Sequence, residues 1–132
     1  MPQRKQLSPD WPWASSHRIA QGVQVGDTVY TSGQIAMDPA GNLVGEGDLG
    51  AQARQVFANI RAILAEAGAT MDDVVKITAS ITDMSQYADY SAARAEAFPN
   101  NVPASSTVSC PVLVSPELLV EVEAVAVIGS GS

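Results

Sequence analysis

The chain has 132 residues, a net charge of −7 and 46% hydrophobic residues. This length suffices for one domain with its own core and is too short for two. No apolar run reaches the roughly 20 residues of a membrane-spanning helix, and the negative charge would repel nucleic acid. We therefore expect one domain whose partners are neither membranes nor nucleic acids.

The sequence shows no pattern of a secretory signal and has few residues of the kinds that bind metal ions. The opening segment has no apolar stretch behind its basic residues, so it is no secretory signal, and a single cysteine, Cys110, cannot form an internal disulfide. Both observations fit the cytoplasm. The one histidine, His17, cannot build a multi-histidine metal centre. A divalent ion bound by carboxylates remains an open alternative, although no spacing of the acidic residues favours it. We expect no metal.

The two ends of the chain differ from the rest in composition. Residues 1–18 hold several prolines and no clean periodicity, which predicts an irregular arm anchored by Trp11 and Trp13. The two tryptophans could instead line a ligand pocket. Residues 129–132 are typical of a flexible tail. The remaining span, residues 19–128, is the expected domain.

The first half of that domain begins with β structure. Residues 19–34 contain two β-prone runs separated by Gly26-Asp27, which predicts a hairpin. After a loop rich in glycine and proline, Asp48 is the expected N-cap of an amphipathic helix. Gly68 provides the stop signal for this helix.

The second half alternates between the two kinds of element. Residues 74–82 alternate in polarity and predict a half-exposed strand, with Val75 on its buried face. Asp83 is the expected start of a second helix, which stops before Pro99 and whose charged residues are expected to form a solvated face. The last two β-prone runs are residues 107–114 and 118–127.

The order of the elements, β-β-α-β-α-β-β, predicts the fold class. It indicates an α+β domain with one mostly antiparallel or mixed sheet and both helices on one face. The chain has no further element to cover the other face of the sheet. Self-association is the simplest way to bury that face.

The final strand carries two carboxylates. Alternation places Glu121 and Glu123 on the same face, roughly 7 Å apart. If they are buried, at least one must be paired, hydrogen-bonded or raised in pKa, as in a working acid or base. If they lie on the wet side of an antiparallel strand, both are ordinary surface residues. The segment alone leaves both interpretations open.

Four segments together resemble the Rid family of reactive-intermediate imine and enamine deaminases, also called the YjgF/UK114 group. They are QGV leading into VGDTVYTSGQI, then AQARQVFANIRAILAEAG, then DDVVKITASITDM, and finally PASSTV with VEVEAVAV. The resemblance implies a chorismate-mutase-like fold and a homotrimer whose sheets form a central barrel, with clefts between subunits. It also implies hydrolysis of 2-imino or 2-enamino acids to 2-oxo acids and ammonia, without a metal or organic cofactor.

The resemblance assigns roles to particular residues. Glu121 falls on the family's glutamate that orients or activates water, and Gly33 and Thr107 fall where backbone groups line the cleft. The family's carboxylate-binding arginine follows a Pro-Ala pair, but here that position is Ser105. Ile19 stands where family members often have a cleft tyrosine.

Loss of the arginine affects substrate binding. The Ser105 hydroxyl cannot reproduce the bidentate grip of a guanidinium on a carboxylate. Arg18 is a candidate substitute anchor, with an ordinary surface arginine as the alternative. Otherwise the cleft accepts a substrate without a carboxylate. Its expected lining comprises Ser32, Gln34, Ser105, Thr107, Ser109 and Cys110.

Two nucleophile candidates carry less weight than the glutamate. No lysine flanks Cys110 and the histidine is distant in sequence, so we expect the thiol to be buried and inert. Ser32 lacks the G-x-S-x-G context of a nucleophile elbow. A ribonuclease is disfavoured by the charge of −7 and by the lack of a pair of histidines.

We therefore predict a cofactor-independent Rid-type enzyme. It hydrolyses a small imine or enamine to a carbonyl compound and ammonia, with a preference altered from 2-imino acids. One alternative is a lyase, tautomerase or condensation enzyme acting on an unsaturated carbonyl or enamine. The other is a non-catalytic trimer that binds a small ligand.

Overall fold

The computed structural model describes residues 3–16 and 18–132, which form one six-stranded sheet with the order β1-β2-β3-β6-β4-β5. The strands are β1 (Arg4–Leu7), β2 (Gly22–Val25), β3 (Thr28–Thr31), β4 (Val74–Ile81), β5 (Ala104–Ser109) and β6 (Val120–Val127). The helices are α1 (Leu49–Ala65) and α2 (Tyr87–Ala97), with short 3-10 helices η1 (Pro12–Ser16), η2 (Met71–Asp73) and η3 (Met84–Gln86).

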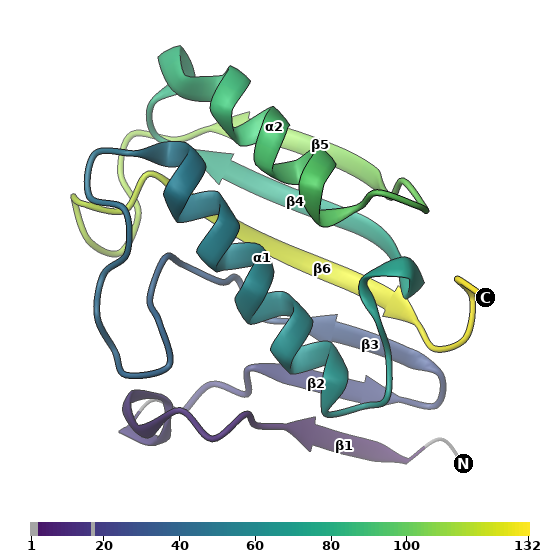
Figure 1. The fold of residues 1–132 in the computed structure, drawn as a ribbon. Coiled ribbons are helices and arrows are strands. Elements are labelled where there is room, and N and C mark those ends of the chain that lie inside the picture. The colour runs from purple at the N-terminus through teal and green to yellow at the C-terminus, as the bar shows by residue number, and fades with distance from the viewer. Residues whose placement is uncertain (1–2, 17) are drawn as a thin grey trace.

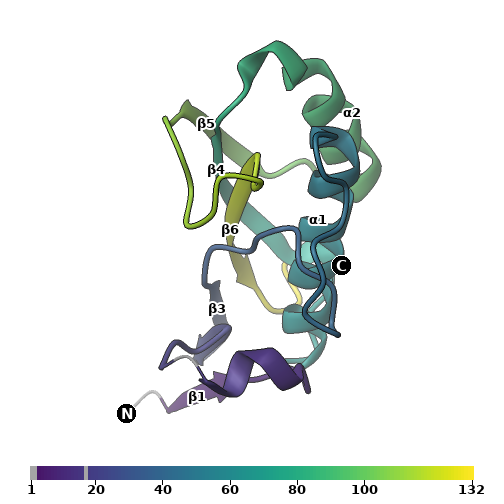
Figure 2. The same ribbon diagram turned by 90° about the vertical axis from the view of Figure 1, so that its left-hand side faces the viewer.

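Both α-helices lie across one face of the sheet (Figure 1), and the edge-on view shows them together on one side of the strands (Figure 2). Strands β4 and β5 pair in parallel, and the other neighbouring strands pair antiparallel. The predicted α+β class with two helices on one face is confirmed. None of the described helices is long and apolar enough to cross a membrane.

Helix α1 follows its local sequence signals. The Asp48 side chain accepts a hydrogen bond from the N–H of Ala51 at 3.0 Å, which caps the helix start as predicted. Beyond the last turn, Gly68 has φ 73, and the N–H of Ala69 donates to the Leu64 carbonyl at 3.0 Å. The apolar stripe of α1 packs on the sheet and forms the core with, among others, Val56, Ile60, Ile63, Ile77, Val122 and Ala124.

The predicted alternation in β4 fails at its first residues. The register against β6 shifts between Val74 and Lys76, as in a β-bulge. As a result Val74 is 3% exposed and Val75 is 41% exposed. The prediction that Val75 faces the core was wrong, because a bulge adds one residue and so inverts the alternation on one side of it.

The N-terminal arm is more regular than expected, because Arg4–Leu7 forms the edge strand β1. Strand β1 pairs antiparallel with β2, and Leu7 is buried. The rings of Trp11 and Trp13 stack with centroids 5.6 Å apart, and Nε1 of Trp13 donates to the Asp38 carbonyl at 3.1 Å. The tryptophans thus pack the arm against the domain.

The C-terminal residues also contact the domain. The N–H of Gly131 donates to Oδ1 of Asp73 at 2.9 Å, and Nδ2 of Asn101 donates to the Gly131 carbonyl at 3.1 Å. These contacts differ from the expectation of a free tail at residues 129–132.

Candidate functional site

Glu121 lies on the helix-free face of the sheet. Its neighbour Val122 is fully buried on the opposite face, under the helices, and Glu121 itself pairs across the strands with Ser80 of β4. Glu121 is half-buried, whereas Glu123 on the same face is exposed. Of the two interpretations of this pair, the buried one therefore applies in part to Glu121 and the solvated one to Glu123.

The environment of Glu121 favours its protonated form. Burial raises the pKa of the Glu121 carboxyl, and repulsion from the Glu123 carboxylate raises it further. A carboxyl group with a raised pKa holds a proton more firmly than an exposed glutamate does, and can both accept and return a proton during a reaction. Glu121 is therefore the described carboxylate best suited to acid–base chemistry on this face.

Gly33, in the loop after β3, lies against the Glu121 carboxylate. A Cβ at Gly33 would come within 2.5 Å of Oε2 and 2.7 Å of Cδ of Glu121, so the absence of a side chain makes room for this carboxyl group. The loop is tied to β6 by two backbone hydrogen bonds: the Gln34 N–H donates to the Val122 carbonyl at 2.8 Å, and the Val122 N–H returns a bond to Gln34 at 3.1 Å.

The other residues predicted near Gly33 have different roles. Oγ of Ser32 donates to the Ala20 carbonyl at 2.6 Å and so joins the loop to the segment before β2. The Gln34 side chain is 2% exposed and donates to Oε1 of Gln21 at 2.9 Å, so it supports the loop from within the core. The sequence does reveal the Gly33 position, but not that the side chain of Gln34 turns away from the open face.

Arg18 and Ile19 are exposed at the β1–β2 side of the sheet, where they adjoin Arg4 and Gln6. Strand β5, which carries Ser105, forms the opposite edge of the sheet. Within one chain Arg18 therefore does not approach Ser105.

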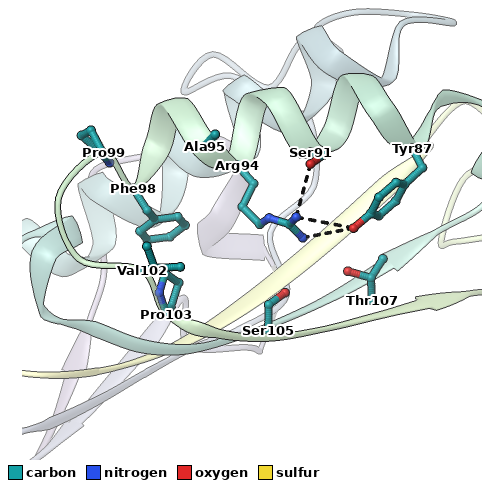
Figure 3. Close-up of a pocket in the computed structure, with 10 residues that line it drawn as sticks. All are labelled: Tyr87, Ser91, Arg94, Ala95, Phe98, Pro99, Val102, Pro103, Ser105 and Thr107. Atoms are coloured by element: carbon teal, nitrogen blue, oxygen red, sulfur yellow. Dashed lines mark hydrogen bonds between the residues drawn. The ribbon is translucent and has the colours of Figure 1, made fainter.

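Ser105 and Thr107 face the helices. Ser105 pairs with Ile77 and Thr107 with Ala79 in the parallel register of β5 and β4, and both partners are fully buried on the helix side. A cavity of about 760 Å³ lies between β5 and α2 (Figure 3). It is lined by Tyr87, Ser91, Arg94, Ala95, Phe98, Pro99, Val102, Pro103, Ser105 and Thr107.

Arg94 extends from α2 into the space above Ser105 (Figure 3). Its guanidinium donates to the Tyr87 hydroxyl at 3.4 Å and to Oγ of Ser91 at 3.3 Å. The sequence prediction had treated the charges of this helix as a solvated face. The available signal was the spacing of Tyr87, Ser91 and Arg94 at i, i+4 and i+7, which puts them on one helix face.

Cys110 lies just beyond the end of β5 and outside this cavity. Its N–H donates to the Ile81 carbonyl at 3.0 Å, and the residue is half-buried with a free thiol, so it is less buried than expected. Ser109 is exposed. In the described part of the chain, no group of three or more His, Cys, Asp or Glu residues is placed to hold a metal ion.

The predicted site residues therefore form two separate groups in one chain. Glu121 and Gly33 lie on the helix-free face, whereas Ser105 and Thr107 lie on the helix face next to Arg94. Since the sheet separates the two groups, no small ligand can contact both within one chain.

The strand order and the two helices on one face define an α+β protein of the YjgF fold. The RidA protein of an Antarctic Psychrobacter species has a TM-score of 0.85 to this structure at 35% identity, over 94% of this chain and 99% of that one. A Rid-family protein of unknown function from Yersinia pestis has a TM-score of 0.88 at 32% identity, over 96% of this chain and 100% of that one.

Sequence similarity leads to the same family. The family model described as Endoribonuclease L-PSP matches residues 12–128. A RutC family protein of Pyrococcus abyssi is 36% identical over 107 residues, which cover 81% of this chain and 84% of that protein. The chain belongs to the Rid family, also called YjgF/UK114.

Proposed function

We propose that this protein is a cofactor-independent Rid-type enzyme that hydrolyses a small imine or enamine to a carbonyl compound and ammonia. The observation that supports this most directly is Glu121, a half-buried carboxyl group with a raised pKa that lies against Gly33 on the helix-free face. Family membership supplies the reaction class.

Glu121 acts on water in this proposal. Water adds to the carbon of the protonated C=N bond while the Glu121 carboxylate takes one of its protons, which gives a neutral carbinolamine. Glu121 then returns this proton to the amine, the C–N bond breaks, and ammonia leaves as the carbonyl forms and the hydroxyl proton passes to Glu121 and on to solvent. Backbone N–H groups near Thr107 stabilise negative charge that develops on the substrate.

We also infer that a second copy of the chain completes the site. The Glu121 group and the Ser105 cavity lie on opposite faces of one sheet, so a cleft that contains both requires two chains. The helix-free face also carries apolar side chains: Tyr30 is 51% exposed and Val108 49% exposed. A homotrimer, with the helix-free faces turned inward as a barrel, covers these side chains and makes three equivalent clefts.

Other functions are alternatives to this proposal. The serine at position 105 favours a lyase, tautomerase or condensation reaction, in which no carboxylate needs to be held by β5. A non-catalytic ligand-binding trimer would keep the cavity without turnover. The endoribonuclease activity in the family model's description suits this chain poorly, because its charge of −7 repels RNA. A cytoplasmic location fits the free Cys110 thiol.

The test is a substrate screen on the purified protein. Imines generated in the assay by an amino-acid oxidase are offered beside enamines that lack a carboxylate, and the release of ammonia and of carbonyl product is measured against the uncatalysed rate. We expect faster ammonia release from at least one imine. Conversion without ammonia release would favour the lyase or tautomerase, and binding without any conversion would favour the non-catalytic trimer.

A further inference from the structure

Arg94 takes up the space that the small Ser105 side chain leaves open in the cavity between α2 and β5. We propose that Arg94 is the anion anchor of this cavity and binds the carboxylate of a small carboxylic acid with an apolar substituent. The proposal rests on the proposed function for the reaction that follows binding, but the binding itself is independent of Glu121.

The first support is the charge balance around the guanidinium. Among the described residues, Arg54 and Glu96 form an ion pair, with 2.9 Å between Nε and Oε2. No carboxylate oxygen of the described residues lies within 4.0 Å of the Arg94 guanidinium. The partners of Arg94 are neutral hydroxyls at 3.3 to 3.5 Å, which are long for hydrogen bonds. A half-buried guanidinium with five N–H donors and only such contacts retains donors for an anion.

The second support is an unpartnered buried hydroxyl next to Arg94. Tyr90 is 0% exposed, and its Oη makes no hydrogen bond of ordinary geometry among the described residues. Arg94 lies over the Tyr90 ring, 5.4 Å from its centroid, and both Arg94 and Thr107 are close enough to influence the hydroxyl electrostatically. A ligand oxygen bound between Arg94 and Thr107 would give this hydroxyl a well-placed acceptor.

The cavity walls indicate what else the ligand carries. Phe98, Val102 and Pro103 form an apolar end, whereas hydroxyls of Ser105 and Thr107 line the β5 side. A ligand with a carboxylate at Arg94 and a short aliphatic group toward Phe98 matches both parts. The ligand is then a small carboxylic acid with an apolar substituent, whose carboxylate is held from α2 instead of β5.

The residues at positions 94 and 105 are complementary in charge and size. An arginine at position 105 would face the same cavity as Arg94, and two guanidinium groups there would repel one another. With serine at position 105, a guanidinium from α2 is accommodated without a like-charged neighbour on the strand. The loss of the family arginine is thus offset by a cation on the facing helix.

The experiment measures binding and not turnover. The probe is 4-methyl-2-oxopentanoate, a stable carboxylic acid with the product's shape, and its methyl ester is the uncharged control, both titrated by calorimetry into the full chain. The wild type should bind the acid more tightly than the ester. Arg94→Ala should weaken acid binding by roughly 10-fold to 100-fold and leave ester binding little changed.

Three further variants separate anchoring from folding and from catalysis. Arg94→Gln keeps a polar side chain with N–H donors on α2 but removes the charge, and it should weaken acid binding as Arg94→Ala does, so the test remains available if the alanine variant folds poorly. The double variant Arg94→Ala/Ser105→Arg moves the cation to β5 and should regain acid binding. Turnover is not the readout of this experiment, so the loss of turnover that we expect for Glu121→Gln leaves this proposal intact. Arg61→Ala, an exposed arginine on α1, is the matched control.

Several results would overturn the proposal. They are a folded Arg94→Gln protein that binds the acid as tightly as the wild type, wild-type binding that does not distinguish acid from ester, and the absence of acid binding by the wild type. Thermal unfolding of each variant shows which of them are folded.

Discussion

Gly33 and Glu121 are in such close contact that a methyl group on the glycine would lie 2.5 Å from Oε2 of the glutamate. The atoms that a Cβ would meet are the end of a flexible side chain and not backbone. An alanine is therefore accommodated by rotation of the carboxyl group, which moves it from its place on the helix-free face.

We accordingly expect Gly33→Ala to fold but to lose turnover of the imine substrate by roughly 10-fold to 100-fold, since a displaced catalytic group loses alignment. Ammonia release and thermal unfolding are the two measurements. In the double variant Gly33→Ala/Glu121→Gln the glycine change should add little to the effect of Glu121→Gln. Equal, additive losses would show that Gly33 acts independently of the carboxylate.

Glu121→Gln should remove the acid–base group while keeping the shape of the side chain. We expect kcat to fall by roughly 10² to 10⁴ with the fold retained. Glu46→Gln, at an exposed loop position, is the control and should keep the wild-type rate. Wild-type turnover by Glu121→Gln would exclude this glutamate as the acid–base group and return the question to the rest of the cleft.

The pH profile of turnover depends on Glu123. Because the Glu123 carboxylate contributes to the raised pKa of Glu121, Glu123→Gln should lower that pKa. A base with a lower pKa is deprotonated at lower pH, so the acidic limb of the kcat/KM profile should move to lower pH. The measurement is kcat/KM across the acid range in both proteins. An unmoved or oppositely shifted limb would mean that the limb reports another group.

Much of the fold was predictable because its signals are local. The Asp48 cap and the Gly68 stop each depend on residues within about one turn of each other, and both are present. Strand β5 was placed too late, at residues 107–114, because Ser105 and Ser106 have weak β propensity. Parallel pairing with β4 determines its span, and Lys76 helps through a 2.9 Å bond from Nζ to Ser106.

The candidate site was predictable only in part, for a related reason. Alternation in β6 was enough to put Glu121 and Glu123 on one face, but it could not say which face the helices cover. The contribution of Arg94 depends on which side of α2 turns toward β5, and that follows from packing between distant segments. The bulge at Val75 belongs to the same class of feature, since it exists only in the pairing of β4 with β6.

Stability should depend on pH through Glu121. Its pKa is raised in the folded state, so the folded protein binds more protons than the unfolded chain just above the ordinary glutamate pKa, and stability falls as pH rises through this window. Glu121→Gln removes this effect. We therefore expect its advantage in Tm over the wild type to grow from acidic to neutral pH. A constant difference at all pH values would contradict the raised pKa, and Glu46→Gln is the matched control.

Association through the helix-free face can be tested with one charge. Val108 of β5 pairs with Ser80, which shares that face with Glu121, and its side chain is half exposed in the single chain. A carboxylate there would be buried in the proposed barrel, at a cost of several kcal/mol if left unpaired. Val108→Glu should therefore shift the protein from trimer to monomer in light scattering, without unfolding the domain.

The same substitution should reduce imine turnover, because the Glu121 group of one chain then loses the Ser105 cavity of its neighbour. Met84→Glu adds the same charge at an exposed position in η3, outside the sheet, and should leave both assembly and turnover unchanged. Full turnover by a monomeric Val108→Glu protein would show that one chain holds a complete site. A trimer that survives the substitution would place the interface elsewhere.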